Sequence, residues 1–317
     1  MKPLPTLRAA QLATAPPSAH NWLIEGLWSA EAVGIIGGPP KTCKSFLALD
    51  LAVAVASGTP CLRHFPVPQR GPVLLFAAED NVHVVRARLE GIAAAAGVVF
   101  DDLDIHIITV PVLRLDRRED RLALAATVAL LLPKLLVLDC FVRLHGVDEN
   151  VVGEVAPILA YLRTLQRSHH TAVALVHHAR KGAAHERGGQ ALRGSSEFHA
   201  WGDTNLLLRR MGKQLQLSIE HRAAPSTDWF PVVLKDRPSA VALEVVDQHP
   251  AVAQVTQPSC RERIEKALAA AGTPLTQKAL RDMVRMRTGD VGQALAALIA
   301  EGRVIKSAAG YQPGSSR

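Results

Sequence analysis

The chain has 317 residues, a formal net charge of +7 and a hydrophobic content of 48%, enough for one large core and a second, smaller domain. Its four cysteines lie far apart and form no C-x-x-C pair, so their spacing indicates neither a disulfide framework nor a zinc site, and a reducing cytoplasm is the expected location. The basic balance favours a polyanionic partner, with surplus surface charge for solubility as the alternative.

Residues 1–20 are predicted to be a flexible arm, because prolines interrupt them and they contain no continuous apolar stretch of signal-peptide length. Farther along the chain, the apolar run at 122–138 is broken by Pro133 and Lys134, well short of a membrane span. We therefore expect a soluble protein without a membrane partner.

Short apolar runs bounded by turn residues predict buried strands, at 32–37, 72–78, 104–110, 135–139 and 171–177. The segments between them have helical patterns, at 47–57, 82–96, 122–131 and 153–166. This alternation favours an α/β fold with a mostly parallel sheet that helices cover on both faces.

The pattern changes after residue 194. Four β-rich segments, predicted to extend the sheet as antiparallel strands, follow at 205–210, 214–220, 230–234 and 240–246. The stretch 247–259 is polar, contains two prolines and has no period, so it is predicted to be a linker. The chain is thus expected to have a core domain at 21–246 and a tail domain at 260–317.

The first predicted strand runs into a Gly/Pro loop and then a helix, as in a Walker A phosphate-binding loop. Its backbone N–H groups would wrap the phosphates of ATP, with the Lys44 ammonium at the β and γ phosphates and the Ser45 hydroxyl on Mg²⁺. Where the motif has glycine this chain has Cys43, and a side chain at positive φ costs about 1–2 kcal/mol. A thiol at a helix N-terminus is also expected to have a lowered pKa. The predicted nucleotide-binding residues are Gly38, Pro39, Pro40, Lys41, Thr42, Cys43, Lys44, Ser45 and Phe46.

Two further strands end in acids, and in a parallel sheet they open onto the same edge as the phosphate loop. Asp139 closes a strand in the manner of a Walker B acid that holds Mg²⁺, with helix capping as the alternative role. Glu79 is the favoured group to activate the attacking water, and Asp80 is expected to cap the helix that follows it.

His177 and His178 are adjacent on a strand and point to opposite faces, so they are not expected to chelate one metal ion. One imidazole would hydrogen-bond the γ-phosphate and report its loss to the next loop, with a structural histidine as the alternative. That loop, 179–194, is glycine-rich and basic, and either contacts nucleic acid or is a solvated loop. Its candidate contacts are Arg180, Lys181, Arg187 and Arg193.

The tail carries ten Lys/Arg against five Asp/Glu from residue 257 onward. Helical patterns at 261–270, 276–284 and 291–300, followed by a short strand pair, predict a winged-helix-like domain. The third helix offers only Gln293 for base readout, so backbone contacts to duplex DNA are favoured, with protein docking as the alternative. The candidate backbone contacts are Arg281, Arg285, Arg287 and Lys306.

Several of these motifs together resemble bacterial RecA-superfamily ATPases of the AAA_25 or RepA-helicase-like type. The matching residues are GPPKT at 38–42 with KS at 44–45, AED at 78–80, LD at 138–139 with DEN at 148–150, VHHARK at 176–181 and RGSS at 193–196. The resemblance implies an ATPase core that assembles into rings or filaments.

By this resemblance Lys44 and Ser45 bind the nucleotide and Mg²⁺, Glu79 is the catalytic acid, Asp139 is the Walker B acid and His178 senses the γ-phosphate. It also implies a cation supplied by the neighbouring subunit, with Arg222 favoured over Arg209 and Arg210. Helicase-like relatives carry an arginine where this chain has Asp203, which argues against strong helicase activity.

The function expected from the sequence is therefore ATP hydrolysis on or near DNA. Single-stranded DNA would bind the central loop, residues 179–194, and duplex DNA would bind the tail domain. The alternative is a regulatory assembly factor in which ATP only controls binding. A small-molecule kinase is disfavoured because no acceptor-site motif accompanies the phosphate loop.

Overall fold

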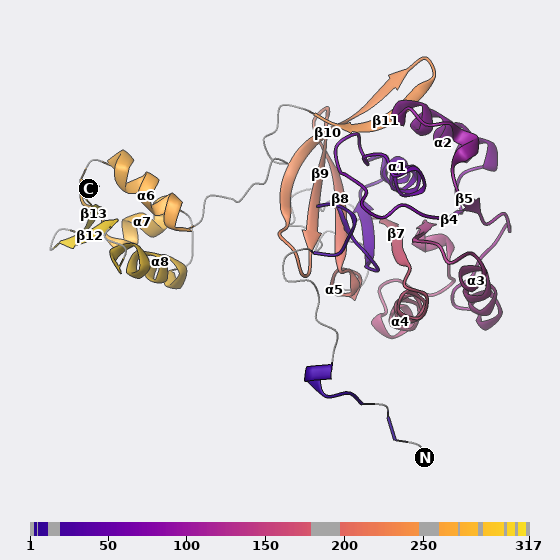
Figure 1. Cartoon of the computed structure of the whole chain (residues 1–317), viewed down its shortest axis with the longest axis horizontal. Helices are drawn as coiled ribbons and strands as arrows, with labels where there is room; N and C mark the ends of the chain where they lie inside the picture. Colours follow the sequence, from indigo (N-terminus) through magenta and orange to yellow (C-terminus); the bar gives the residue numbers. More distant parts are fainter. Residues whose placement is uncertain are drawn as a thin grey trace. The chain divides into compact units, whose positions relative to one another are not determined.

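The computed structural model describes residues 3–4, 6–11, 20–178, 197–246, 260–271, 273–284, 288–300, 303–307 and 310–314. It divides into two compact units, Met1–His249 and Pro250–Arg317 (Figure 1). Among the helices of the described ranges, none is long and apolar enough to cross a membrane.

A nine-stranded sheet with the order β11-β10-β9-β8-β3-β7-β6-β4-β5 organises the larger unit. Neighbouring strands are parallel from β8 to β5 and antiparallel from β8 to β11. The strands are β3 (Val33–Gly38), β4 (Val73–Ala77), β5 (Ile105–Ile107), β6 (Leu135–Asp139), β7 (Ala172–His178), β8 (Thr204–Met211), β9 (Gln214–His221), β10 (Thr227–Arg237) and β11 (Ala240–Val245). The predicted α/β class with an antiparallel extension is confirmed, with one refinement: β8 is parallel to β3.

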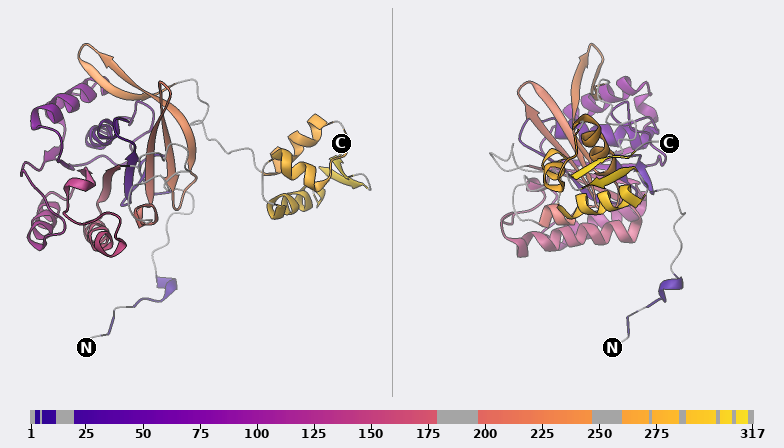
Figure 2. Two further views of the ribbon diagram at one scale, coloured as in Figure 1. Left: turned by 180° about the vertical axis from the view of Figure 1, so that it is seen from behind. Right: turned by 90° about the vertical axis from the view of Figure 1, so that its left-hand side faces the viewer.

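Helices cover both faces of the parallel part (Figures 1 and 2). One face of the sheet, with Leu136 and Leu138 of β6, packs against the helices that follow β5 and β6. The central helix after β3 contacts the strands from the other face, together with the helix after β4. The helices are α1 (Lys44–Ser57), α2 (Val82–Ala96), α3 (Arg118–Leu131), α4 (Val152–His169) and α5 (Glu197–Trp201). Because both faces are covered, the central strands have continuous apolar sequences rather than alternating apolar and polar residues.

The antiparallel extension returns toward the helices, since β11 packs against α2. Gly91, in the middle of α2, marks the close approach: a Cβ there would lie 3.1 Å from the Val241 backbone nitrogen. Glycine is otherwise unfavourable inside a helix, so the contact explains its presence. The unit also contains the small hairpin β1 (Trp22–Ile24) and β2 (Trp28–Ser29), which the sequence patterns did not indicate.

Helix α1 buries an acid. The Asp50 side chain is fully buried, and each of its carboxylate oxygens accepts a hydrogen bond from Arg63 at 2.6 Å. The Leu62 N–H donates to the same carboxylate at 2.8 Å. Burial raises the pKa of Asp50, and the Arg63 guanidinium opposes that shift.

The smaller unit has its own core. It consists of α6 (Cys260–Ala271), α7 (Gln277–Val284), α8 (Thr288–Ala300) and the antiparallel hairpin β12 (Val304–Ser307) and β13 (Gly310–Pro313). Ile264, Leu280, Leu295 and Leu298 are among its buried side chains. Three helices and a hairpin occur in the order expected, and the winged-helix assignment itself stays a prediction.

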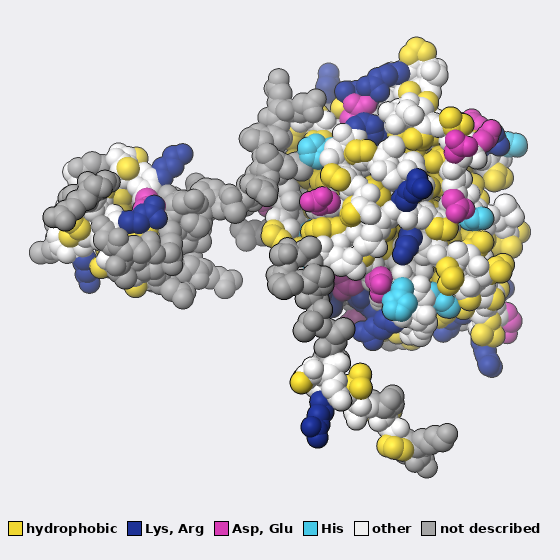
Figure 3. Space-filling view, in the orientation of Figure 1, with side chains coloured by type: hydrophobic (Ala, Val, Ile, Leu, Met, Phe, Trp, Pro, Cys, Tyr) yellow, Lys and Arg dark blue, Asp and Glu magenta, His cyan; other side chains and the backbone are white. Residues whose placement is uncertain are grey.

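On the face shown in Figure 3, basic, acidic and hydrophobic side chains are interspersed over the larger unit. The described charges on that face are therefore mixed in sign. The excess of positive charge that the sequence carries is not concentrated there.

Candidate functional site

The phosphate loop begins where β3 ends. Gly38 has φ of 153°, and a Cβ there would lie 2.3 Å from the Leu208 carbonyl oxygen, so only glycine fits. Beyond it, the Pro39 carbonyl accepts hydrogen bonds from the Thr42 hydroxyl and the Lys44 ammonium, both at 2.8 Å. Lys44 is 6% exposed, and burial lowers its pKa against the opposing effect of Asp139.

Cys43 precedes α1 in the left-handed region, with φ of 63° and ψ of 26°. The position therefore has the conformation for which the motif uses glycine. Burial raises the pKa of the Cys43 thiol, against the effects of Arg210, Lys44 and Arg88. The expected lowering of this pKa is wrong, because burial outweighs the nearby positive charges.

One cavity of about 310 Å³ gathers the ends of several strands. It is lined by the loop and helix residues Lys41, Thr42, Cys43, Lys44, Ser45 and Phe46, by the acids Glu79, Asp80 and Asp139, and by Arg88, Val176 and His178. The convergence follows from topology, since β3, β7, β6 and β4 are adjacent and parallel, and their carboxyl ends meet at one edge.

Asp139 and Ser45 form a hydrogen-bonded pair on this edge. Burial raises the pKa of Asp139 to about 6; the Ser45 hydrogen bond lowers it, and the negative charges of Asp80 and Glu79 raise it further. A carboxylate and a hydroxyl beside the phosphate loop are oxygen donors of the kind that Mg²⁺ takes, and a cation would relieve the repulsion among the acids. These residues fit the metal ion.

Glu79 follows β4 and has a side chain 43% exposed. Its Oε1 accepts a hydrogen bond from Arg143 Nε at 3.1 Å, and its carboxylate also hydrogen-bonds the Cys140 thiol. Burial, with the charges of Glu79 and Asp139, raises the pKa of Cys140 to about 12, so this group is a neutral thiol. Sequence patterns singled out neither Cys140 nor Arg143, because no motif connects them to Glu79.

Asp80 does not cap α2. The cap is Asn81, whose Oδ1 accepts from the His83 N–H at 3.1 Å, because the helix begins one residue later than an Asp80 cap requires. Asp80 instead forms an ion pair with Arg88, whose guanidinium lies 5.1 Å from the centroid of the Phe46 ring. Arg88 lies about two helical turns beyond Asp80, a spacing that could have indicated the pair.

The side chains of the two histidines of β7 point to opposite faces of the sheet, because they are adjacent on a strand. The buried His177 ring stacks on Phe198, with centroids 4.2 Å apart and planes at 20°, and meets Phe141 edge-on. His178 lines the cavity instead. The favoured sensor thus lies at the phosphate edge, and its neighbour belongs to the core.

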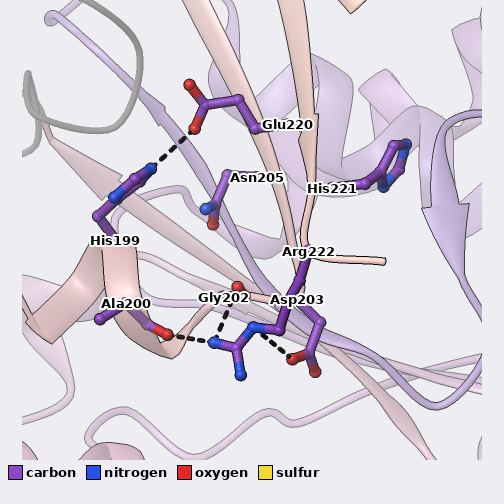
Figure 4. A pocket seen from close by; sticks show the side chains of 8 residues that line it. All are labelled: His199, Ala200, Gly202, Asp203, Asn205, Glu220, His221 and Arg222. Atoms are coloured by element: carbon purple, nitrogen blue, oxygen red, sulfur yellow. Dashed lines mark hydrogen bonds and ion pairs between the residues drawn. The ribbon is translucent and has the colours of Figure 1, made fainter. Parts of the chain in front are cut away.

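Arg222 lies at the opposite edge of the sheet, after β9 and beside the start of β8 (Figure 4). Its guanidinium donates to the carbonyls of Ala200 and Gly202 and pairs with Asp203. It lines a second cavity, of about 230 Å³, with His199, Glu220 and His221 among its other residues. Arg222 is therefore not among the residues that line the cavity beside the phosphate loop of its own chain.

The other arginines considered for that role lie toward the phosphate edge. Arg209 stacks on Trp229, with its guanidinium carbon 4.0 Å from a ring centroid. Arg210 follows it on β8, and its charge acts on Cys43. Asp203 accepts hydrogen bonds from Arg163 as well as pairing with Arg222, which gives this acid a structural role.

Most of the predicted nucleic-acid contacts, namely Arg180, Lys181, Arg187, Arg193, Arg285 and Arg287, lie outside the described residues. Lys306 is exposed on β12, with its Nζ 5.9 Å from the centroid of the Tyr311 ring.

Sheet order, phosphate loop and acidic strand ends together define a P-loop ATPase of the RecA superfamily. The AAA_25 family model, described as an AAA domain, matches residues 2–184, more than half of the chain. The chain belongs to this family.

Two solved structures, a recombinase and a replicative helicase, agree on the fold. RadB recombinase is similar over 68% of this chain and 91% of its own, with 17% identity and a TM-score of 0.51. A DnaB-like replicative helicase is similar over 67% of this chain and 59% of its own, with 14% identity and a TM-score of 0.50. A KaiC-like protein from Pyrococcus horikoshii matches at 16% identity and a TM-score of 0.47, over 70% of this chain and 93% of its own.

Proposed function

We propose that this chain binds ATP with Mg²⁺ and hydrolyses it at the cavity beside the phosphate loop. The observation that carries the proposal is the convergence of Lys44, Ser45, Glu79, Asp139 and His178 around one cavity. Together they supply an ammonium, a hydroxyl, two carboxylates and an imidazole, which can bind the phosphates, hold a metal ion and position or activate the attacking water.

Lys44 would leave the Pro39 carbonyl and bind the β and γ phosphates, which the N-terminus of α1 also attracts. Ser45 and Asp139 would hold Mg²⁺, which neutralises charge on the phosphates when bound. Glu79 would accept a proton from the attacking water, and the His178 imidazole would hydrogen-bond the γ-phosphate.

We infer that Arg143 restrains Glu79. The ion pair at 3.1 Å and the hydrogen bond from the Cys140 thiol hold the carboxylate and compete with the water for its oxygen atoms. This pair is also the observation that favours the alternative function, in which ATP controls assembly and turnover is slow.

The test compares two substitutions in the same cavity. Lys44→Ala is expected to lose nucleotide affinity, because it removes the cation that contacts the phosphates. Glu79→Gln is expected to bind ATP normally and to hydrolyse it about 10²- to 10⁴-fold more slowly, the loss typical of a missing general base. Fluorescent-nucleotide titration and phosphate release separate the two effects.

Glu90→Gln is the matched control, because Glu90 is an exposed acid on α2 that pairs with the exposed Arg86 and does not line the cavity. It should hydrolyse ATP at the parental rate. If Glu79→Gln also does so, Glu79 is not the catalytic acid, and Asp80 becomes the candidate.

We further propose that the ATPase acts on or near DNA, as a motor or a switch, and assembles with copies of itself. The net charge of +7 and the basic tail support a polyanionic partner. Two proteins of similar fold, a recombinase and a replicative helicase, support DNA as that partner. DNA-stimulated turnover distinguishes this function from the alternative, in which DNA or protein binds without stimulating hydrolysis.

A further inference from the structure

Three potential metal ligands of different chemistry meet beside the ATP cavity. They are a carboxylate oxygen of Glu79, the sulfur of Cys140 and an imidazole nitrogen of His178, and these atoms all lie within 4.8 Å of one another. Glu79 follows β4, Cys140 follows β6 and His178 ends β7, three strands that lie side by side in the sheet. The residues are far apart in sequence, and strand order alone brings them together.

The donor set selects the metal. A thiolate, an imidazole and a carboxylate are the ligands of Zn²⁺ and similar ions, whereas Mg²⁺ takes oxygen donors. The cluster therefore differs chemically from the Ser45 and Asp139 pair. We propose that Glu79, Cys140 and His178 form a second, inhibitory metal site for a thiophilic divalent ion, with Zn²⁺ as the best match.

The geometry requires only a small adjustment. Ligand atoms of a tetrahedral zinc site lie roughly 3–4 Å apart, so the three atoms must approach by about 1 Å. The Glu79 side chain is 43% exposed and can turn, and Arg143 occupies only its Oε1. The Cys140 thiol proton leaves to solvent as the sulfur–metal bond forms. Three protein ligands leave a fourth position for water.

Metal binding would stop hydrolysis by occupying two groups of the proposed mechanism, and this consequence rests on the proposed function. A metal-bound Glu79 cannot accept a proton from water, and a metal-bound His178 nitrogen cannot contact the γ-phosphate. Lys44 is not a ligand, so ATP binding through the phosphate loop should persist. The metal ion would thus lower the rate of ATP hydrolysis and leave the affinity for ATP unchanged.

Cys140 supplies the discriminating substitution. A serine can replace its hydrogen bond to Glu79 but is a far poorer ligand for a thiophilic ion. Cys43→Ser is the matched control, because this second thiol lines the cavity that Glu79 and His178 also line and does not belong to the three-residue cluster.

Co²⁺ titration of the full chain without nucleotide tests the site independently of catalysis. We expect a thiolate-to-cobalt charge-transfer band that saturates at one equivalent, disappears on addition of Zn²⁺ and is absent in Cys140→Ser. His178→Asn and Glu79→Gln should weaken Co²⁺ binding by at least about tenfold, while Cys43→Ser should retain the band. A band that persists in Cys140→Ser, one that is lost in Cys43→Ser, or none in the parent overturns the proposal.

A second measurement tests inhibition. With Mg²⁺ in excess, Zn²⁺ should lower the turnover of the parent and leave its ATP affinity unchanged, while Cys140→Ser retains its own metal-free rate. Equal inhibition of both proteins would overturn the inhibitory role. If the parent hydrolyses no ATP, the proposed function fails, and the Co²⁺ titration still decides whether the metal site exists.

Discussion

At the scale of single residues, the phosphate loop departs from its motif at one position. Cys43 has φ of 63°, a conformation that glycine adopts freely and other residues adopt at a cost. Lys41, two residues earlier in the loop, also has positive φ, at 62°. The loop is thus held by its contacts at Pro39 and by α1 rather than by local backbone preference.

Replacing Cys43 with glycine should relieve this cost. Cys43→Gly is expected to bind ATP at least as tightly as the parent and to be stabilised by up to about 1 kcal/mol, because greater freedom in the unfolded chain offsets part of the relief. Nucleotide titration and urea unfolding measure the two effects. Cys43→Ala, which keeps the Cβ, should show no such stabilisation. A large loss of ATP binding in both variants would instead show that the sulfur has a role of its own.

At the scale of secondary structure elements, α1 connects the cavity to the core. Its first residue is Lys44, and six residues later Asp50 is fully buried and joined to Arg63, whose side chain is 18% exposed. The Nε and Nη1 atoms of Arg63 have no hydrogen-bond partner among the described atoms. The carboxylate is thus the main compensation for burying this guanidinium.

Removing one partner of such a buried pair leaves the other uncompensated. Asp50→Ala should therefore lower the free energy of unfolding by about 3–5 kcal/mol, measured by urea denaturation. Asp101→Ala, at an exposed acid, is the control and should change it by less than about 0.5 kcal/mol. The double variant Asp50→Leu with Arg63→Leu should recover much of the loss. A single variant as stable as the parent would mean that the pair contributes nothing.

At the scale of the whole molecule, the chain contains two units with separate cores. The residues that line the ATP cavity all belong to the larger unit. The central basic loop begins directly after His178, whereas the tail follows residues 247–259. We therefore expect the two candidate DNA contacts to differ in their coupling to hydrolysis.

Deletion of residues 257–317 should leave basal ATP hydrolysis intact. Joint replacement of Arg180, Lys181 and Arg187 by alanine should abolish DNA-stimulated hydrolysis and leave duplex binding by the tail unchanged, because only this loop is adjacent to His178. Phosphate release with and without single-stranded DNA, at two salt concentrations, measures the coupling.

The matched control replaces three exposed basic residues elsewhere, Arg86, Lys134 and Lys213, and should retain stimulation. If the loop variant keeps full stimulation and the tail deletion loses it, coupling runs through the tail domain.

Local patterns were sufficient for most of the elements, the hairpin of β1 and β2 and the short helix α5 excepted, and for most of the cavity. Apolar runs predicted the strands because both faces of a parallel sheet are buried, and residues at the strand ends could be placed at one edge because parallel strands point the same way. For this reason Lys44, Ser45, Glu79 and Asp139 could be grouped from the amino-acid sequence by itself with one of the two histidines of β7, and the family resemblance favoured His178. Helix α1 begins at Lys44, three residues before the predicted start at residue 47. Apolar periodicity therefore did not predict the first residues of this helix.

Tertiary structure alone decided which side chains face each other. The placement of Arg222 at the edge opposite its own ATP cavity and the meeting of Glu79, Cys140 and His178 depend on the order and direction of the strands in the sheet. In the chain β5 comes between β4 and β6, but in the sheet it lies on the outer side of β4, so that β4 and β6 are neighbours. Motif and periodicity are properties of neighbouring residues, whereas contacts between strand ends are set by packing across the whole sheet.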